Sequence, residues 1–515
     1  MQEKQTGSFY TPKLLVEYMS KYVMKRSIEC ILEPSFGDGR FLEALKGQKI
    51  DAVELDITKV EHAATTKSEN VNLICANFVE YALSSEMKYD LVIGNPPYIS
   101  KKAVSEQERE LSLQLMNYWS LPDSIFQNLW VSFVLGSLKL LKDNGVIFFV
   151  LPFEFLQVHY AEKLRAVLEE KFNLIEITTF KESVFPDIEQ DVCLVLMTNV
   201  PLKEPIVKYT TVKSISDFTP LEYSEIKRNK PLKKWSNAIL NDDEIELLMN
   251  LSSRYIKVDQ LGDSSPGIVT GANNFFILNK TEVDQLKGID LVLPLIQKGS
   301  DLGGQLVLTS NDFNELDELN KKVWLLQLND KNINNISLEL GEYLQDGIDK
   351  KINKRYKCEN RKNWYEVPII TSGDLMFFKR YNKIPKLVVN EASVNATDIA
   401  YNIRLHKQFD PYSVAFCFYN TLTFTLCEYF GRFYGGGVGE LVPSEFKSLS
   451  IPYKNINRNS VKKLERMLKS KNSIESILKY VDNIVLNDLS KDELLVLNRI
   501  REKYLIRRLK ITPPV

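Results

Sequence analysis

The sequence predicts an α/β protein: a Rossmann-like doubly wound sheet, then a mixed α/β domain and a helical C-terminal tail. Over residues 1–200, short apolar strands alternate with amphipathic helical segments, which is the pattern of a doubly wound fold. From about Leu261 to Pro452 the segments are short and mixed, with many Gly and Asn turns. From Ser460 to about Lys510, apolar residues recur at helical spacing. We therefore predict three domains within the 515 residues, at 1–220, 221–455 and 456–515.

The first predicted strand leads into a glycine-rich turn, Glu33-Pro34-Ser35-Phe36-Gly37-Asp38-Gly39, and a helix begins near Phe41. Gly37 and Gly39 allow a ligand to approach the backbone closely. The spacing is not G-x-G-x-x-G, and no Walker Gly-Lys-Ser/Thr follows, so a phosphate-binding loop is disfavoured.

Polar residues end the next two predicted strands. The predicted strand Asp51–Asp56 ends in acidic residues, of which Glu54 can accept hydrogen bonds from both hydroxyls of a ribose. The strand Asn72–Ala76 ends at Asn77-Phe78. A glycine loop and a ribose acid without a phosphate loop fit a nucleoside cofactor that lacks a pyrophosphate, and S-adenosylmethionine is the obvious candidate. Each residue alone also fits a solvated strand end, but their order along the chain makes that reading improbable.

The fourth predicted strand, Tyr89–Gly94, runs directly into Asn95-Pro96-Pro97-Tyr98. Two prolines fix φ at consecutive positions and supply no N–H, so the carbonyls before them are not used by a sheet. The Asn95 carboxamide and the carbonyl in the Pro96 region can both accept from one exocyclic NH2, and Tyr98 offers a flat face to a planar ring. This arrangement suits N-methylation of an amide or an aminopurine. The same four residues also fit an ordinary strand-ending turn, and alone they do not decide between the two.

In this order, the motifs resemble those of the gamma-class N6-adenine DNA methyltransferases, the Taq-like modification methylases of type II restriction–modification systems. The resemblance covers about Thr6 to Met197 and extends more loosely over the remainder. It implies that Asn95, Pro96 and Tyr98 are catalytic. It also implies that Phe185, in Phe185-Pro186, stacks with Tyr98 on the substrate base.

The resemblance also implies the cofactor site, in which the N-terminal motif Tyr10-Thr11-Pro12 closes over the methionine moiety. The implied cofactor-binding residues are Tyr10, Thr11, Pro12, Glu33, Pro34, Gly37, Gly39, Phe41, Glu54, Asn77, Phe78 and Asn95. Asn77 is a departure, because the family usually has Asp there to meet the amino group of the cofactor adenine. An amide oxygen can still accept that bond, so we expect weaker cofactor affinity.

These expectations amount to a site-specific methyltransferase that flips an adenine out of double-stranded DNA and methylates N6. An RNA adenine methyltransferase, a protein glutamine N-methyltransferase and a catalytically inactive DNA-binding module are the alternatives. The resemblance further implies a monomer, with a companion restriction endonuclease possible.

The charge distribution favours a nucleic-acid partner. The chain has 66 Lys and Arg and 67 Asp and Glu; residues 1–200 contain 20 and 28 of these, which leaves 46 and 39 for residues 201–515. A surplus of cations in the second half suits contact with phosphates, although chance variation between domains could also produce it. Three segments are candidates for DNA contact there: residues 267–274, 356–365 and 431–439.

The remaining composition excludes several classes of protein. The chain begins without an apolar signal segment and contains no apolar run long enough to span a bilayer, so we expect a cytoplasmic protein with no membrane contact. The six cysteines include no C-x-x-C pair, and the three histidines are isolated. We therefore expect no metal site.

Overall fold

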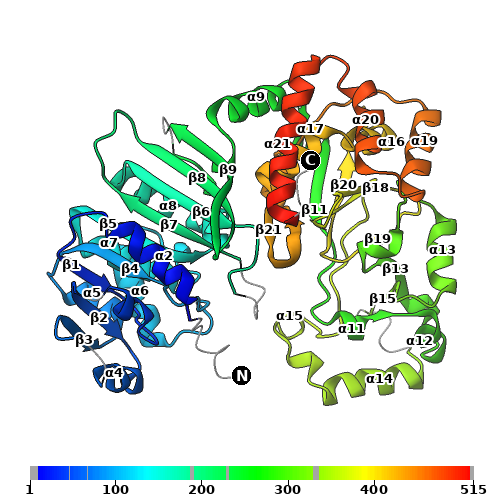
Figure 1. The fold of residues 1–515 in the computed structure, drawn as a ribbon. Helices are drawn as coiled ribbons and strands as arrows, with labels where there is room; N and C mark the ends of the chain where they lie inside the picture. The colour runs from blue at the N-terminus through cyan, green and yellow to red at the C-terminus, as the bar shows by residue number, and fades with distance from the viewer. Residues whose placement is uncertain are drawn as a thin grey trace. The chain divides into compact units, whose positions relative to one another are not determined.

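The computed structural model describes residues 10–45, 47–65, 68–185, 191–227, 231–328 and 336–510. These residues form two compact units, one mainly of the residues up to Ile245 and the other mainly of Glu246 to Arg508. Figure 1 labels their helices and strands.

The first unit is built on a nine-stranded sheet with the order β3-β2-β1-β4-β5-β7-β6-β8-β9. The first five strands in this order run parallel, and β7 is antiparallel to both of its neighbours. The order changes direction between β1 and β4, which is the switch point where such sheets bind ligands beyond their carboxyl ends. The strands are β1 (Cys30–Glu33), β2 (Lys49–Glu54), β3 (Val71–Cys75), β4 (Tyr89–Gly94), β5 (Leu141–Pro152), β6 (Leu174–Phe180), β7 (Val192–Thr198), β8 (Ile206–Ser214) and β9 (Asp217–Lys227).

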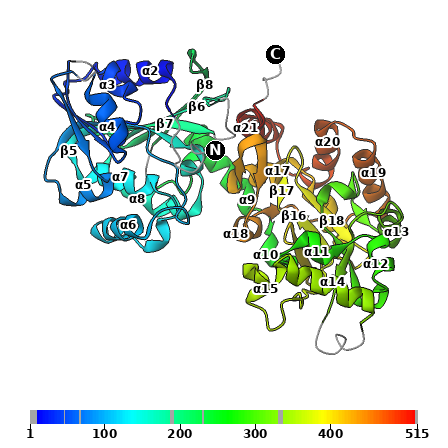
Figure 2. The same ribbon diagram turned by 90° about the horizontal axis from the view of Figure 1, so that it is seen from below.

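Helices cover both faces of this sheet, and Figure 2 shows α2 and α3 on one side with α6, α7 and α8 on the other. Alternate strand residues such as Ile31 and Ile93 pack with Leu15 and Met19 of α2 in one core, as expected for strands whose side chains alternate between the faces. The helices are α2 (Lys13–Val23), α3 (Arg40–Ala44), α4 (Ile57–Ala64), α5 (Phe78–Ser84), α6 (Glu106–Tyr118), α7 (Trp130–Lys139) and α8 (Glu162–Lys171). The predicted doubly wound α/β fold is therefore confirmed for this part of the chain.

The first unit extends beyond the boundary predicted at residue 220. That residue, Pro220, lies inside β9, which pairs with β8 from Asp217 to Lys227. Ending the domain at 220 would remove residues 221–227 of the edge strand and leave the ladder groups of β8 that face them unpaired. β8 and β9 form a hairpin at the edge of the sheet, in which β8 is largely buried and β9 is the more exposed outer strand.

The second unit is mixed α/β and contains two larger sheets. The five-stranded sheet has the order β11-β20-β16-β18-β14, and the four-stranded sheet has the order β12-β15-β13-β19. Their strands are β11 (Gly262–Pro266), β12 (Ile277–Leu278), β13 (Val292–Ile296), β14 (Val307–Leu308), β15 (Trp324–Leu326), β16 (Leu375–Phe378), β18 (Lys386–Asn390), β19 (Asn395–Ala396) and β20 (Ala400–Leu405). Short strands complete the set: β10 (Ile256–Lys257), β17 (Arg380–Tyr381), β21 (Arg432–Tyr434), β22 (Val438–Glu440) and β23 (Ser450–Ile451).

Short helices connect these strands. They are α9 (Asp242–Ser253), which spans the division between the units, α10 (Val258–Leu261), α11 (Asn273–Phe276), α12 (Lys280–Gln285), α13 (Ser310–Glu318), α14 (Leu338–Asp349), α15 (Tyr356–Glu359), α16 (Pro411–Phe418), α17 (Thr421–Phe430) and α18 (Pro443–Lys447).

The predicted helical tail forms α19 (Arg458–Lys469), α20 (Ile474–Val485) and α21 (Lys491–Leu509), and nearly all of it belongs to the second unit. Helices α19 and α20 contact each other and α16. Near the end of α21, the buried Arg508 guanidinium donates to both carboxylate oxygens of Glu428 in α17, at 2.9 and 2.7 Å. A two-pronged ion pair of this kind fixes the tail within the unit rather than leaving it as a separate domain.

Candidate active site

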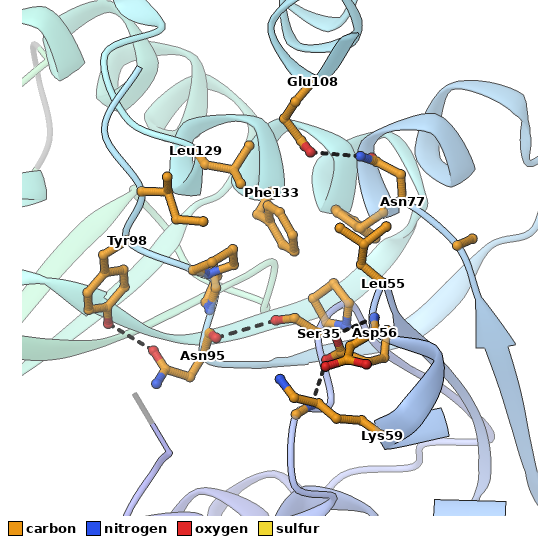
Figure 3. A pocket seen from close by; sticks show the side chains of 18 of the residues that line it. Ser35, Leu55, Asp56, Lys59, Asn77, Asn95, Tyr98, Glu108, Leu129 and Phe133 are labelled. Atoms are coloured by element: carbon orange, nitrogen blue, oxygen red, sulfur yellow. Dashed lines mark hydrogen bonds between the residues drawn. The ribbon is translucent and has the colours of Figure 1, made fainter. Parts of the chain in front are cut away.

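A cavity of about 470 Å³ opens beyond the carboxyl ends of β1, β2, β3 and β4. Parallel strands present these ends at the same sheet edge, so loops that are far apart in the sequence meet here. Four of the predicted segments contribute: the glycine turn after β1, Glu54 at the end of β2, Asn77 after β3, and Asn95 to Tyr98 after β4. The structure thus brings these four segments together around one cavity, part of which Figure 3 shows.

The glycine turn needs the conformational freedom that the sequence suggested. Gly37 has φ +57° and Gly39 has φ +79°, both in the left-handed region where an L side chain is strained. A Cβ added to Gly37 would also lie 3.6 Å from the Tyr10 ring. The backbone of Gly37 therefore lies open to the cavity, with Tyr10 packed against it.

The Glu54 carboxylate is held in place by the backbone. One of its oxygens accepts from the Gly37 N–H at 3.0 Å and the other from the Asp56 N–H at 3.1 Å. Each carboxylate oxygen accepts more than one hydrogen bond, so both can also receive hydroxyl groups from a ligand. This is the geometry required of an acid that binds a ribose diol.

The N-terminal segment lies over the glycine turn. Arg40 donates to the Thr11 carbonyl at 2.7 Å and forms an ion pair with Asp38 at 2.8 Å. The Arg40 guanidinium and the Lys59 ammonium lie 5.9 and 5.8 Å from the centre of the Tyr10 ring, within reach of cation–π attraction. Tyr10 lines the cavity. Thr11 is buried and does not line it, and its backbone carbonyl accepts the hydrogen bond from Arg40.

A buried acid, Glu33, lies next to the glycine turn without lining the cavity. Glu33 is 1 % exposed, and among the described residues its Oε2 has no hydrogen-bond partner. Burial, and then the nearby charges of Asp38 and Glu54, raise the pKa of Glu33 well above its usual range. A ligand carrying positive charge would relieve this repulsion. The ribose acid, the open glycine backbone and this acidic group together fit S-adenosylmethionine, which has a ribose and two cationic centres.

The Asn95-Pro96-Pro97-Tyr98 loop forms the other side of the cavity, and two hydrogen bonds fix its first and last residues. The Tyr98 hydroxyl lies 2.9 Å from the Asn95 Oδ1 and 3.0 Å from the Val150 carbonyl, and can donate to either. The Ser35 hydroxyl donates to the Asn95 carbonyl at 3.4 Å, which joins the loop to the glycine turn. Burial raises the pKa of Tyr98 well above its usual range, so the hydroxyl keeps its proton. The Asn95 carboxamide is thereby oriented with its oxygen toward Tyr98.

Asn77 lines the cavity but uses its amide differently from the sequence-based expectation. Its Oδ1 accepts from the Val79 and Glu80 N–H groups at 2.8 and 3.2 Å, as the N-cap of α5, and its Nδ2 donates to Glu108 at 2.8 Å. We expected this oxygen to accept from the cofactor, and instead it is engaged by the helix. Capping satisfies backbone donors that the first turn of a helix otherwise leaves unpaired.

Several residues that line the cavity were not singled out from the sequence. Leu55 and Asp56 directly follow Glu54, so their position was available from the motif. Lys59, Glu108, Leu129 and Phe133 come from helices or from the chain just before them, and no local signal marks them. The full additional set is Ser35, Leu55, Asp56, Lys59, Ala76, Pro97, Ile99, Glu108, Leu129 and Phe133.

Other predicted site residues lie close to the cavity without lining it. Phe41 is buried in the core on the α2 face, and Gly39 lines a neighbouring hollow that also includes Tyr10 and Gly37. Phe185 is buried in the same apolar cluster against which Tyr98 packs. Its predicted neighbour Pro186 lies outside the described residues. The residues on the list that do not line the cavity are Thr11, Pro12, Glu33, Gly39, Phe41 and Phe185, judged over the described part of the chain.

The described ranges contain no group of three or more His, Cys, Asp and Glu residues placed to hold a metal ion. Within the same ranges, no helix combines the length and apolar character needed to cross a membrane.

Two models of one protein family match the chain. Residues 17–185 match the Eco57I restriction-modification methylase, and residues 232–486 match the C-terminal domain of the Type II methyltransferase M.Eco57I. Among individual proteins, the Type II methyltransferase M.AccI of Acinetobacter calcoaceticus is 26% identical over 479 residues, which are 86% of this chain and 84% of M.AccI. M.HincII of Haemophilus influenzae, also a Type II methyltransferase, is 29% identical over 192 residues, 36% of each chain.

A solved structure has the same fold over nearly the whole chain. The Type IIL restriction-modification enzyme MmeI, solved in complex with DNA, superimposes with a TM-score of 0.54 and 12% sequence identity. The match covers 98% of this chain and 73% of MmeI.

Proposed function

The chain belongs to the Eco57I restriction-modification methylase family, and we propose that it transfers a methyl group from S-adenosylmethionine to N6 of adenine in double-stranded DNA. One observation carries the proposal: the Asn95-Pro96-Pro97-Tyr98 loop and the Glu54–Gly37 cofactor features line the same cavity. A methyl donor and a planar amine held on these two sides would meet within it.

Residues on and around the glycine turn would hold the cofactor. Bound S-adenosylmethionine would supply a methyl group on a positively charged sulfur. Glu54, held by two backbone N–H groups, would bind the ribose hydroxyls. Tyr10 would cover the amino-acid moiety, held by the Arg40 contact with Thr11. Leu55 and Phe78 would enclose the adenine ring between apolar side chains.

The acceptor half follows from the hydrogen-bonding capacity of the loop. The Asn95 Oδ1 and the Pro96 carbonyl would accept the two N6 hydrogens of adenine. An amide oxygen can accept two hydrogen bonds, so the bond from Tyr98 is compatible with this role and orients the acceptor. Hydrogen bonds to both N6 hydrogens would draw the nitrogen from planar toward tetrahedral geometry and aim its lone pair at the methyl carbon. The N–C bond would form as the S–C bond breaks, with S-adenosylhomocysteine as the leaving group, and the extra N6 proton would be lost to water. Positioning of this kind accounts for much of the rate when the methyl donor is already reactive.

Adenine in a duplex is stacked and paired, so the nucleotide must leave the helix to reach the cavity, at a cost of a few kcal/mol. Tyr98, which lines the cavity, would stack on the extruded ring, whereas Phe185 lies in the apolar cluster against which Tyr98 packs. The excess of Lys and Arg over Asp and Glu in residues 201–515 supports contact of this half with the phosphates. We further propose a monomeric cytoplasmic enzyme that forms the modification part of a restriction–modification system.

The test is to express the chain in a bacterial host free of DNA methylation and to map modified adenines by single-molecule sequencing. We expect nearly every copy of one short motif to carry N6-methyladenine, and the Asn95→Ala variant to abolish this signal. Asn117→Ala makes the same chemical change on the exposed surface of α6 and should leave the map unchanged.

An unmodified genome in cells that contain the folded, cofactor-binding protein would overturn the DNA assignment. Methylated adenines in RNA, or methylated glutamine in protein, would then identify which of the alternative substrates is used. Full methylation by Asn95→Ala would instead keep the substrate and remove Asn95 from the mechanism.

A further inference from the structure

The Asn77 side chain, which lines the cofactor side of the cavity, has its acceptor engaged within the fold. Its Oδ1 takes hydrogen bonds from two backbone N–H groups of α5, at 2.8 and 3.2 Å. A carboxamide oxygen has two lone pairs, so these two bonds use its capacity. The remaining amide group is a donor and points to Glu108. Asn77 therefore offers no acceptor to an amino group entering this part of the cavity.

Glu108 brings a carboxylate to the same place from a different element. Its spacing from Ser105 is that of a capping box, in which the glutamate side chain would return to the backbone of Ser105. The structure contains only half of that motif: the Ser105 hydroxyl accepts from the Glu108 N–H at 3.2 Å. The Glu108 carboxylate instead reaches 31 residues back along the chain and accepts from Asn77 Nδ2 at 2.8 Å.

The surroundings of this carboxylate suit the edge of a purine. Glu108 is half-buried and lines the cavity together with Phe78, Leu55 and Phe133. The centres of the Phe78 and Phe133 rings lie 4.7 Å apart, so the side of the cavity next to Glu108 is apolar. Burial raises the pKa of Glu108, and the bond from Asn77 only partly opposes that shift. An amine buried against this apolar side of the cavity needs a hydrogen-bond acceptor. Among the described residues only Asn77 donates a side-chain hydrogen bond to Glu108, so the carboxylate has capacity for a further donor.

We propose that Glu108, oriented by Asn77, accepts the hydrogen bond of the cofactor's exocyclic adenine amine and thereby selects adenine over other purines. The inference rests on the proposed function, because it assumes a cofactor built on adenosine. Asn77 fixes one carboxylate oxygen, and the other accepts from the amine. A purine with a carbonyl oxygen at that position would place two acceptors against each other, and a site built for an N–H donor rejects such an analogue strongly.

The experiment measures dissociation constants by calorimetry for two ligands, S-adenosylhomocysteine and S-inosylhomocysteine, which differ at that one position. Full-length wild-type protein should prefer the adenine compound by at least about tenfold, the equivalent of one lost hydrogen bond to a charged group. Glu108→Ala should lose about tenfold in affinity for S-adenosylhomocysteine and little for the inosine compound, so that the preference disappears. Glu110→Ala, an exposed glutamate on the same helix, is the matched control and should behave as wild type.

A second variant guards against a merely structural effect. Glu108→Gln keeps the size of the side chain, and its oxygen can still accept from Asn77, which turns its amide N–H toward the ligand. This donor matches a carbonyl and opposes an amine, so the variant should bind S-inosylhomocysteine more tightly than wild type does. General damage to the cavity would weaken both ligands alike and could not produce this gain.

The cofactor and the role of Glu108 are tested separately. If the wild-type protein does not bind S-adenosylhomocysteine, the cofactor of the proposed function is wrong and this inference falls with it. If wild type binds it with the expected preference, and both Glu108→Ala and Glu108→Gln retain that preference, only the role of Glu108 is overturned.

Discussion

Two sets of polar loops in this molecule look alike in the sequence and differ in what the fold does with them. At the sheet edge of the first unit, the loops after β1, β2, β3 and β4 turn their polar groups toward one cavity. In the second unit, the segments 267–274 and 356–365 were predicted to contact DNA. There, the Arg361 guanidinium donates to the carbonyls of Val269 and Thr270, at 3.0 and 2.7 Å, and joins the two segments to each other.

The difference comes from where the backbone finds its hydrogen bonds. Parallel strands satisfy their own ladder groups, so the residues just beyond their ends are available for ligands, and topology brings those ends together. The irregular loops of the second unit have carbonyls that no ladder satisfies, and a nearby Arg is the side chain best able to satisfy several at once. A basic residue in such a loop is therefore weaker evidence for DNA contact than a polar residue at a strand end is for a ligand site.

Arg361→Ala should have the largest effect, and it tests whether Arg361 holds the two loops of the second unit together. The variant leaves two carbonyls without their donor and removes a cation lying 5.6 Å from the centre of the Phe276 ring. We expect a loss of about 2–3 kcal/mol in the free energy of unfolding of the second unit, measured by urea denaturation. Lys357→Ala, an exposed change in the same segment, should cost less than about 0.5 kcal/mol.

A different result would contradict the structural role of Arg361. If Arg361→Ala leaves the free energy of unfolding unchanged, weakens DNA binding and reduces the salt dependence of the affinity, then Arg361 contacts phosphate and does not hold the loops.

Tyr98→Phe and Tyr401→Phe remove one hydroxyl group from each unit, so their effects can be compared directly. The Tyr98 hydroxyl lies 2.9 Å from Oδ1 of Asn95, the acceptor in the proposed mechanism, whereas the buried Tyr401 hydroxyl donates to the Leu441 carbonyl at 2.9 Å. We expect Tyr98→Phe to lower the rate of methyl transfer about tenfold, or about 1.4 kcal/mol, because the Asn95 acceptor loses its orientation. Tyr401→Phe should cost about 1 kcal/mol of stability and leave the rate intact.

Single-turnover transfer of a labelled methyl group to a duplex measures the first effect and thermal unfolding the second. A normal rate for Tyr98→Phe would mean that Asn95 is oriented by the backbone alone, and that Tyr98 contributes only its ring.

The same contrast explains what could be predicted from the sequence. The doubly wound fold and the position of Gly37, Glu54, Asn77 and Asn95 at one cavity follow from the alternation of strands and helices and from the residues at strand ends, which are local features of the chain. Glu108 could not be found this way, because its spacing from Ser105 predicts a capping box and only tertiary packing sends its carboxylate to Asn77.

The predicted boundary at 220 falls within β9, whose sequence is polar and largely exposed and so does not resemble a buried strand of the sheet. The use of Asn77 as a helix cap was missed for a related reason. The residue types that bind ligands at strand ends are also those that cap the helices that follow. Whether such a residue binds a ligand or caps a helix is decided by tertiary packing, which the local sequence does not contain.

The smallest predicted effect compares two buried acids, Glu33 in the first unit and Asp482 in the second. Burial raises the pKa of both. The Asp482 carboxylate is satisfied by the Thr421 N–H and hydroxyl, at 2.9 and 2.6 Å, whereas Glu33 Oε2 has no such partner among the described residues. Without cofactor, we therefore expect Glu33→Gln to stabilise the protein by about 1 kcal/mol at neutral pH, and Asp482→Asn to destabilise it by a similar amount.

The pH dependence fixes the cause of the Glu33 effect. A carboxyl whose folded pKa is raised binds its proton more tightly in the folded state, so its contribution to stability is greatest in acid and declines as pH rises from the unfolded toward the folded pKa. Glutamine does not titrate. The advantage of Glu33→Gln should therefore vanish below the unfolded pKa of about 4.3 and grow above it, while its affinity for the cationic cofactor falls below that of wild type. A pH-independent gain, or unchanged cofactor affinity, would mean that the acid at Glu33 is a packing residue whose charge the site does not use.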